Sequence, residues 1–132
     1  MIDFRLDARS GVPTYLQLVQ QVKRALRLGM LEVGDQLPTV REVVASIAIN
    51  PNTVLKGYRE LEREGLVTSR PGQGTFVRRA LGEVDPSALL RLRSELRQWI
   101  ERARRSGLQG EVVVDLMQST FREVDEAPEV TA

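Results

Sequence analysis

The chain has 132 residues, 42% of them hydrophobic and 28% charged, which is enough for one compact domain or for a small domain with an appendage. It contains no cysteine and no histidine, which excludes disulfides, the usual nucleophile–base pairs of enzymes, and metal sites built from thiolate or imidazole ligands. No apolar run approaches the ~20 residues of a membrane-spanning helix and no signal-like segment follows Met1, so we expect a cytoplasmic, non-enzymatic protein with no membrane partner, metal or cofactor.

The net charge of +1 hides a difference between the two halves of the chain. Residues 1–79 carry 12 Lys and Arg against 8 Asp and Glu, a net charge of +4. Residues 80–132 carry 7 against 10, a net charge of −3. A basic N-terminal half favours a partner that carries phosphate groups, such as DNA.

The first 38 residues are expected to form an extended segment, a helix and a turn. Apolar residues alternate with charged ones at the start, a period of two that is typical of an extended segment on a core. Thr14 followed by Gln17 predicts a capping box, and apolar residues at helical spacing follow up to Gly29. In the connection at 30–38, the apolar side chains expected to point inward are Leu31, Val33 and Leu37.

Basic residues gather near the end of this first predicted helix. They complement the negative end of the helix dipole, or they contact phosphate, and the sequence leaves both interpretations open. The residues are Lys23, Arg24 and Arg27.

Two helix starts lie close together between residues 39 and 64. Thr39 followed by Glu42 forms a capping box, and Asn50 followed by Pro51 combines a capping side chain with a proline at the first helical position. Gly65 ends the second helix. Two short helices separated by a tight turn are the unit that places its second helix in a DNA major groove.

The second helix has one apolar side for the core and one side with short polar residues. Asn can make two hydrogen bonds to adenine, Thr can contact a thymine methyl group, and Lys can reach guanine or phosphate. For Arg41, in the first helix of the pair, the alternative is a solvated surface cation or a partner for Glu42, and for Asn50 it is a capping role alone. The candidate DNA-binding residues of the two helices are Arg41, Asn50, Asn52, Thr53 and Lys56.

A β-hairpin is predicted after the second helix. The strand that begins at residues 66–69 returns through residues 75–77, and the glycines between the strands permit positive φ angles. An ordinary hairpin turn explains the glycines but not the polar and basic residues beside them, so we interpret the hairpin as a DNA-binding wing. Its candidate contacts are Arg70, Gly72, Gln73 and Gly74.

Taken together, residues 10–79 resemble the winged helix-turn-helix domain of GntR-family bacterial transcription regulators. The match is carried by SGVPTYLQLVQQVKRAL, GDQLPTVREVV, NPNTVLKGYRELEREGLV and RPGQGTFV. The short chain and the NPNTV opening are similar to the YtrA-type subgroup, in which a small helical dimerisation tail replaces a large effector-binding domain.

The resemblance implies DNA contacts at five positions and departs from the family at two. Many relatives carry arginines where this chain has Pro51 and Leu55, so guanine recognition of their kind is not expected, and Lys56 is expected to supply the cation. The implied contacts are Arg41, Asn50, Asn52, Thr53 and Gly72.

Two amphipathic helices are predicted after the winged domain. Asp85 followed by Pro86 repeats the cap-then-proline signal, apolar residues then recur at alternating spacings of three and four, and Gly107 and Gly110 separate the two helices. This apolar seam either folds back on the chain's own winged domain or packs against a second subunit, the arrangement we favour. The candidate dimerisation residues are Leu89, Leu92, Leu96, Trp99, Ile100, Ala103, Leu116, Met117 and Phe121.

These features predict a mainly α fold with a small β-hairpin. Residues 1–80 form the winged helix-turn-helix DNA-binding domain, and residues 81–132 form the helical dimerisation tail, whose acidic end from Asp125 to Ala132 is expected to be disordered.

The predicted function is sequence-specific regulation of transcription by a homodimer that binds double-stranded DNA at an inverted-repeat operator, and repression is implied by the resemblance alone. The alternative is a winged-helix adaptor that binds protein rather than DNA. The tail leaves little room for a pocket of ~300 Å³ or more, so no small-molecule effector is expected.

Overall fold

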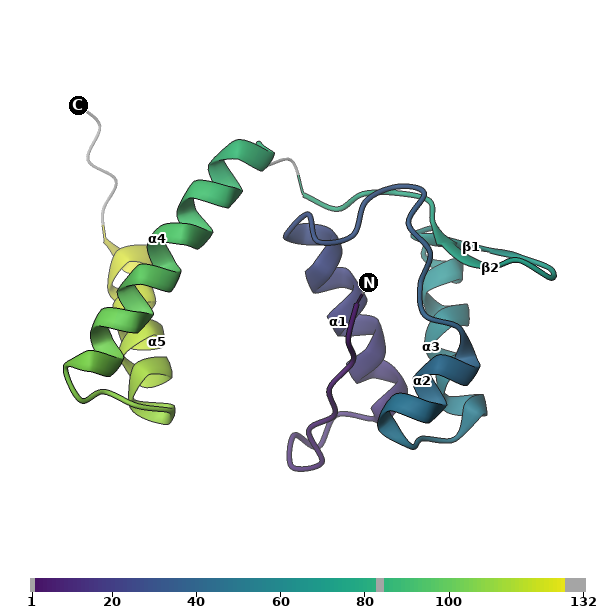
Figure 1. Ribbon diagram of the computed structural model, residues 1–132, viewed down its shortest axis with the longest axis horizontal. Coiled ribbons are helices and arrows are strands. Elements are labelled where there is room, and N and C mark those ends of the chain that lie inside the picture. The colour runs from purple at the N-terminus through teal and green to yellow at the C-terminus, as the bar shows by residue number, and fades with distance from the viewer. Residues whose placement is uncertain (1, 83–84, 128–132) are drawn as a thin grey trace. The chain divides into compact units, whose positions relative to one another are not determined.

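The computed structural model describes residues 2–82 and 85–127, and the chain divides into two compact units at residues 84 and 85 (Figure 1). The first unit contains α1 (Thr14–Arg27), α2 (Val40–Ile47), α3 (Pro51–Arg63), β1 (Val67–Arg70) and β2 (Gly74–Val77). The second contains α4 (Pro86–Arg105) and α5 (Glu111–Glu126). The predicted fold class is therefore confirmed: a winged helix-turn-helix is followed by two helices. No helix within the described ranges is both long and apolar enough to cross a membrane.

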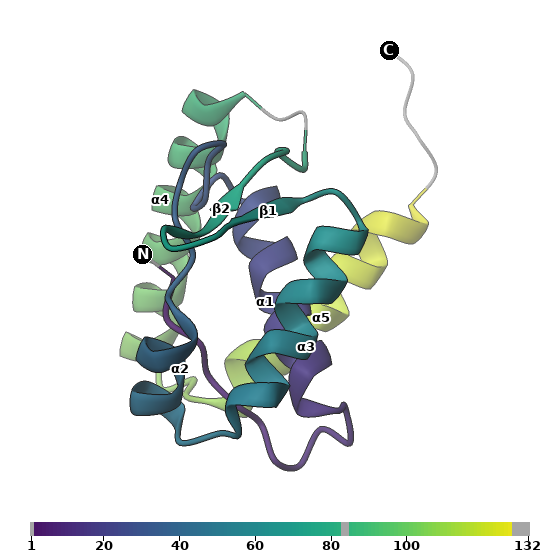
Figure 2. The same cartoon turned by 90° about the vertical axis from the view of Figure 1, so that its right-hand side faces the viewer.

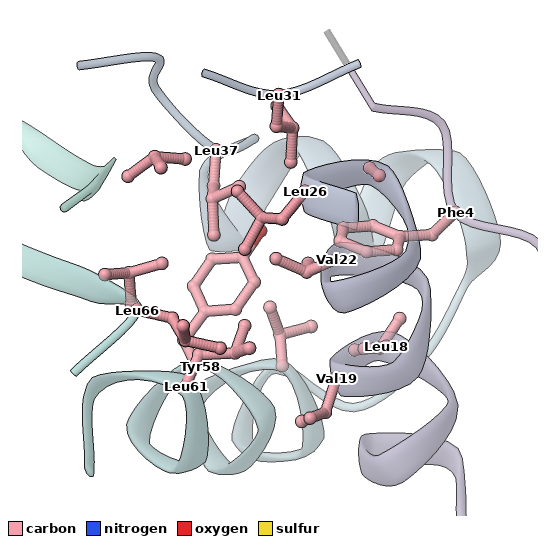
Figure 3. Packing of buried hydrophobic residues seen from close by; sticks show 14 of the residues in the cluster. Phe4, Leu18, Val19, Val22, Leu26, Leu31, Leu37, Tyr58, Leu61 and Leu66 are labelled. Atoms are coloured by element: carbon pink, nitrogen blue, oxygen red, sulfur yellow. The ribbon is translucent and has the colours of Figure 1, made fainter. Parts of the chain in front are cut away.

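The core of the first unit lies between α1, α3 and the base of the hairpin (Figure 3). Tyr58, only 6% exposed, lies among Leu26, Leu37 and Leu66. Its hydroxyl donates a hydrogen bond to the carbonyl oxygen of Pro38 at 2.6 Å, which connects α3 to the residue just before the first turn of α2. Burial, with a smaller contribution from the charge of Glu42, raises the pKa of the Tyr58 phenol well above its ordinary value.

The start of α1 differs from the predicted capping box. Pro13 occupies the N-cap position and no side chain caps the helix. Gln17 is buried, and its side-chain amide instead donates hydrogen bonds of 3.0 Å, 3.1 Å and 2.9 Å to Asp7 O, Ser10 Oγ and Val12 O. The predicted role of Gln17 is wrong because the preceding loop folds back over it and offers three acceptors.

The basic residues near the end of α1 have different environments. Lys23 Nζ lies 2.6 Å from Glu64 Oε1, and each side chain is 28% exposed. Because Glu64 is the C-cap of α3, this ion pair joins the last two turns of α1 to the end of α3. Arg24 and Arg27 are exposed.

The connection before α2 pairs with the hairpin. Gly34 N donates to Val77 O at 2.9 Å, Val77 N to Asp35 O at 2.8 Å, and Leu37 N to Thr75 O at 2.8 Å. Leu37 is buried as predicted, but the prediction for Val33 is wrong, because it remains 61% exposed. The chain turns at Gly34, where φ is +93°, and this turn leaves Val33 on the outside.

The turn between α2 and α3 is as tight as predicted. Ala48 ends α2 in a left-handed conformation with φ +51°, and α3 starts three residues later, at Pro51. β1 and β2 pair in antiparallel register from Val67 opposite Val77 to Arg70 opposite Gly74.

The second unit is a helical hairpin. Asp85 caps α4 by accepting a hydrogen bond from Ser87 N at 3.4 Å, so this predicted start is confirmed. Ala103 and Val113 are buried. α5 continues to Glu126, so the expectation of disorder from Asp125 onward is wrong for its first two residues, and residues 128–132 lie outside the described part of the chain.

Candidate nucleic-acid interface

The candidate DNA-binding residues lie on elements that face the viewer together in Figure 2, namely α2, α3 and the β1–β2 hairpin. The first turn of α2 is fixed by the predicted capping box: Glu42 N donates to Thr39 Oγ1 at 3.1 Å, and Thr39 N donates to Glu42 Oε1 at 3.3 Å. Arg41 is exposed in that turn. A rigid helix start therefore presents a solvated cation.

The first turn of α3 presents amide and hydroxyl groups. Asn50 Oδ1 accepts a hydrogen bond from Asn52 N at 2.8 Å, and the carbonyl oxygen of Asn50 accepts from Thr53 N at 2.9 Å. The Asn50 side-chain oxygen is thus occupied by capping, as the alternative interpretation expected. Asn52 is exposed and Thr53 is half-buried, so Asn52 is the more accessible of the two.

Lys56 lies one turn further along α3 and is exposed. Its ammonium nitrogen is 4.1 Å from the centroid of the Tyr15 ring in α1, which is a cation–π contact. The structure therefore brings α1 into the neighbourhood of the candidate interface. No sequence pattern selects Tyr15, because the contact joins residues 41 positions apart.

The hairpin tip is a turn with proline and glycine at its centre. Gln73 N donates to Arg70 O at 3.0 Å, and Pro71 is followed by Gly72 with φ +71°, an arrangement typical of a type II turn. The guanidinium of Arg70 lies 4.6 Å from the centroid of the Phe76 ring, which holds this cation against the hairpin.

Gly74 adopts a backbone conformation that favours glycine. Its φ is +129°, and a Cβ atom there would lie 2.5 Å from Gln36 Nε2. The same Gln36 nitrogen donates a hydrogen bond of 3.2 Å to the carbonyl oxygen of Gln73. Gln36 therefore covers Gly74 and supports the hairpin tip, a position that no sequence pattern indicated.

A groove of about 600 Å³ lies between the first turn of α2, the middle of α3 and the hairpin. The cations Arg59 and Arg70 line it, together with Glu62, whose Oε2 accepts a hydrogen bond from Ser69 N at 3.1 Å. Arg59 is exposed and was missed, although its spacing of seven residues from Asn52 places both on one side of a helix. The hairpin lining contains Arg70, Pro71, Gly72, Gln73 and Gly74.

The candidate dimerisation residues of the second unit leave much apolar surface uncovered. Leu92, Leu96, Leu116 and Phe121 are 58%, 43%, 40% and 69% exposed. Ala103 differs from them, since it is buried within the single chain and has little surface left for a partner. The half-buried candidates are Leu89, Trp99, Ile100 and Met117.

Comparison with known proteins identifies the first unit. Residues 14–77 match the family model described as bacterial regulatory proteins, gntR family. The HTH-type transcriptional repressor YtrA of Bacillus subtilis (strain 168) is 47% identical over 73 residues, which cover 55% of this chain and 56% of the relative. This chain thus spans little more than half of that protein.

Two further comparisons extend into the second unit. The HTH-type transcriptional regulator YhcF of Bacillus subtilis (strain 168), itself uncharacterized, is 36% identical over 107 residues, which cover 81% of this chain and 88% of the relative. The structure of YtrA from Sulfolobus acidocaldarius, a GntR-family transcription factor, aligns with a TM-score of 0.54 and 30% identity over 77% of this chain and 97% of that one. These matches confirm the resemblance to the YtrA-type subgroup. The chain belongs to the gntR family of bacterial regulatory proteins, which are transcription regulators and not enzymes.

Proposed function

We propose that this chain is a homodimeric, sequence-specific DNA-binding repressor that occupies an inverted-repeat operator in the cytoplasm, without a small-molecule effector. The observation that carries the proposal is the exposed polar surface shared by α2, α3 and the hairpin, with Arg41 and Asn52 both open to solvent. The name of the Bacillus subtilis relative, a transcriptional repressor, supports repression.

Within this surface we assign two kinds of contact. Arg41, Lys56 and Arg70, with the backbone of the hairpin tip, bind phosphates and fix the position of the protein on the duplex. Asn52 and Thr53 contact base edges in the major groove, where an asparagine can make two hydrogen bonds to adenine. Asn50 contributes mainly by holding the backbone of α3 in place.

We assign a different role to each of the two domains expected from the sequence. Residues 1–80 bind DNA and residues 81–132 join two subunits. The apolar seam of α4 supports this assignment, because Leu92 and Leu96 are exposed one turn apart on a 20-residue helix and would be covered by the same helix of a second copy. A two-fold dimer would place its two α3 helices in half-sites one helical turn apart, ~34 Å.

The test of DNA binding begins with selection of bound duplexes from a random pool by the full chain. We expect an inverted repeat to emerge. Asn52→Ala should then lose ~1 to 3 kcal/mol of discrimination at one base pair in each half-site. An unchanged sequence preference would remove Asn52 from base recognition, and a wild-type chain that binds no duplex at low salt would favour the protein-binding adaptor instead.

Repression has its own test. The selected operator is placed across the promoter of a reporter gene, and the chain is supplied in increasing amounts. We expect reporter output to fall, and to stay constant when the operator half-sites are scrambled. A rise in output would make the protein an activator.

The dimer is tested by sedimentation of the full chain and its variants. Leu92→Glu and Leu96→Glu should each shift the protein to monomer, because a charge would be buried in the seam. Leu90→Glu is the matched control. Leu90 is 70% exposed on α4 and lies outside the series of apolar residues that recur at spacings of three and four. Equal effects at Leu90 and Leu92, or no effect at either, would contradict the proposed seam.

A further inference from the structure

Tyr15, which no sequence pattern selected, contacts one of the proposed phosphate-binding residues. It is the second residue of α1 and is half-buried, and the Lys56 ammonium lies over its ring at 4.1 Å. The two helices approach closely here, since a Cβ atom at Gly57 would lie 3.1 Å from the carbonyl oxygen of Tyr15. Because residue 57 is a glycine, α1 and α3 can come this close together. The Tyr15 ring can therefore reach Lys56, the residue before Gly57 on α3.

The contact restricts a side chain that is otherwise mobile. A free lysine loses rotamer freedom when it binds a phosphate, and this loss weakens the contact. A ring that holds the ammonium by cation–π attraction orders the lysine before DNA arrives, while the side of the ammonium away from the ring stays in solvent. Lys56 is exposed, so its charge remains accessible to an anion.

The position of Lys56 relative to Asn52 indicates which anion this would be. The two residues are four positions apart on α3, so their side chains lie on the same side of the helix, one turn apart. A duplex contacted by Asn52 at a base edge would bring backbone phosphates within reach of a cation at that distance along the helix.

We propose that Tyr15 is a positioning residue of the DNA-binding surface, which orders Lys56 for contact with a backbone phosphodiester beside the base pair that Asn52 contacts. This inference rests on the proposed function. Its competitor is a purely structural pair that only stabilises the packing of α1 on α3.

A double-mutant cycle on the full-length protein separates the two. Tyr15→Leu should weaken binding to specific and random duplexes alike, by about two- to five-fold, the range expected for an exposed cation–π contact. Tyr15→Phe keeps the ring and should bind as the wild type does. In the Lys56→Ala background, which should itself lower the slope of log affinity against log salt by about one, Tyr15→Leu should have no further effect.

Independent losses in the double variant would overturn the inference, and so would equal binding by wild type and Tyr15→Leu. If Tyr15→Leu does not fold, the same cycle is measured with Tyr15→Trp, whose ring attracts cations more strongly. With Lys56 present, Tyr15→Trp should bind DNA as tightly as the wild type or more tightly. In the Lys56→Ala background it should give no gain in affinity for DNA. A gain that persists in Lys56→Ala would then count against the inference. Failure of the wild-type chain to bind any duplex would instead refute the proposed function.

Discussion

We expect the hydrogen bond from Tyr58 to Pro38 to contribute measurably to the free energy of unfolding. Tyr58→Phe keeps the buried ring and removes only the hydroxyl, so apolar burial is nearly unchanged, while the Pro38 carbonyl loses a 2.6 Å partner. An unsatisfied buried acceptor costs about 1–3 kcal/mol, so the free energy of unfolding at pH 7 should fall by that amount. Urea denaturation followed by circular dichroism measures this free energy. The slope of the free energy of unfolding against urea concentration should be the same in the variant and the wild type.

Tyr15→Phe is the matched control for this measurement. The Tyr15 hydroxyl makes no hydrogen bond within the described part of the chain, so its removal should change stability by less than about 0.5 kcal/mol. Equal costs at Tyr58 and Tyr15 would refute the reasoning, because the hydrogen bond would then contribute nothing beyond a solvated hydroxyl.

The same substitution should also remove a dependence on alkaline pH. The pKa of Tyr58 is raised in the folded protein, so the phenol loses its proton more readily in the unfolded chain. The stability that the protonated Tyr58 contributes is therefore fully present below the unfolded pKa of about 10 and declines as pH rises above that value. The stability difference between wild type and Tyr58→Phe should therefore shrink above pH 10, by up to about 1.4 kcal/mol per pH unit. A difference that grows with pH in this range would have the wrong sign.

Three further predictions concern the helix starts and the hairpin. Thr39→Ala should lower the free energy of unfolding by about 0.5–2 kcal/mol in the same urea assay, because the capping box is lost. Gly74→Ala should destabilise the protein more than Gly72→Ala, because φ +129° at Gly74 lies far outside the left-handed helical region, whereas φ +71° at Gly72 lies close to it, and equal losses would contradict this difference in backbone strain. Arg41→Ala should weaken binding to specific and random duplexes by the same factor in a fluorescence titration, and a selective loss on the operator would make Arg41 a base contact instead.

Local sequence signals predicted most of the helix boundaries. The capping residues Thr39, Asn50 and Asp85 each accept the expected backbone hydrogen bond, because the partner of an N-cap lies only two or three positions away. The prediction of the hairpin also depends on neighbouring residues alone, since the strand and turn residues are contiguous in the sequence. Such contacts depend on little beyond the neighbouring residues.

Predictions that depended on contacts between distant segments fared less well. Gln17 had the right spacing for a capping box, yet the loop at residues 7–12 supplied better partners for its amide. The support that Gln36 gives to the hairpin and the contact between Tyr15 and Lys56 each join segments more than 30 residues apart. A period or a spacing within one helix carries no information about such pairs.

The strand β2 is bonded along both edges, by β1 on one side and by residues 34–37 on the other. Only residues 71–73 extend past this small sheet, and all three are exposed. Insertions or exchanges at those positions should therefore leave the fold intact. Evolution could vary the side chains at the tip without first having to rebuild the protein that carries them.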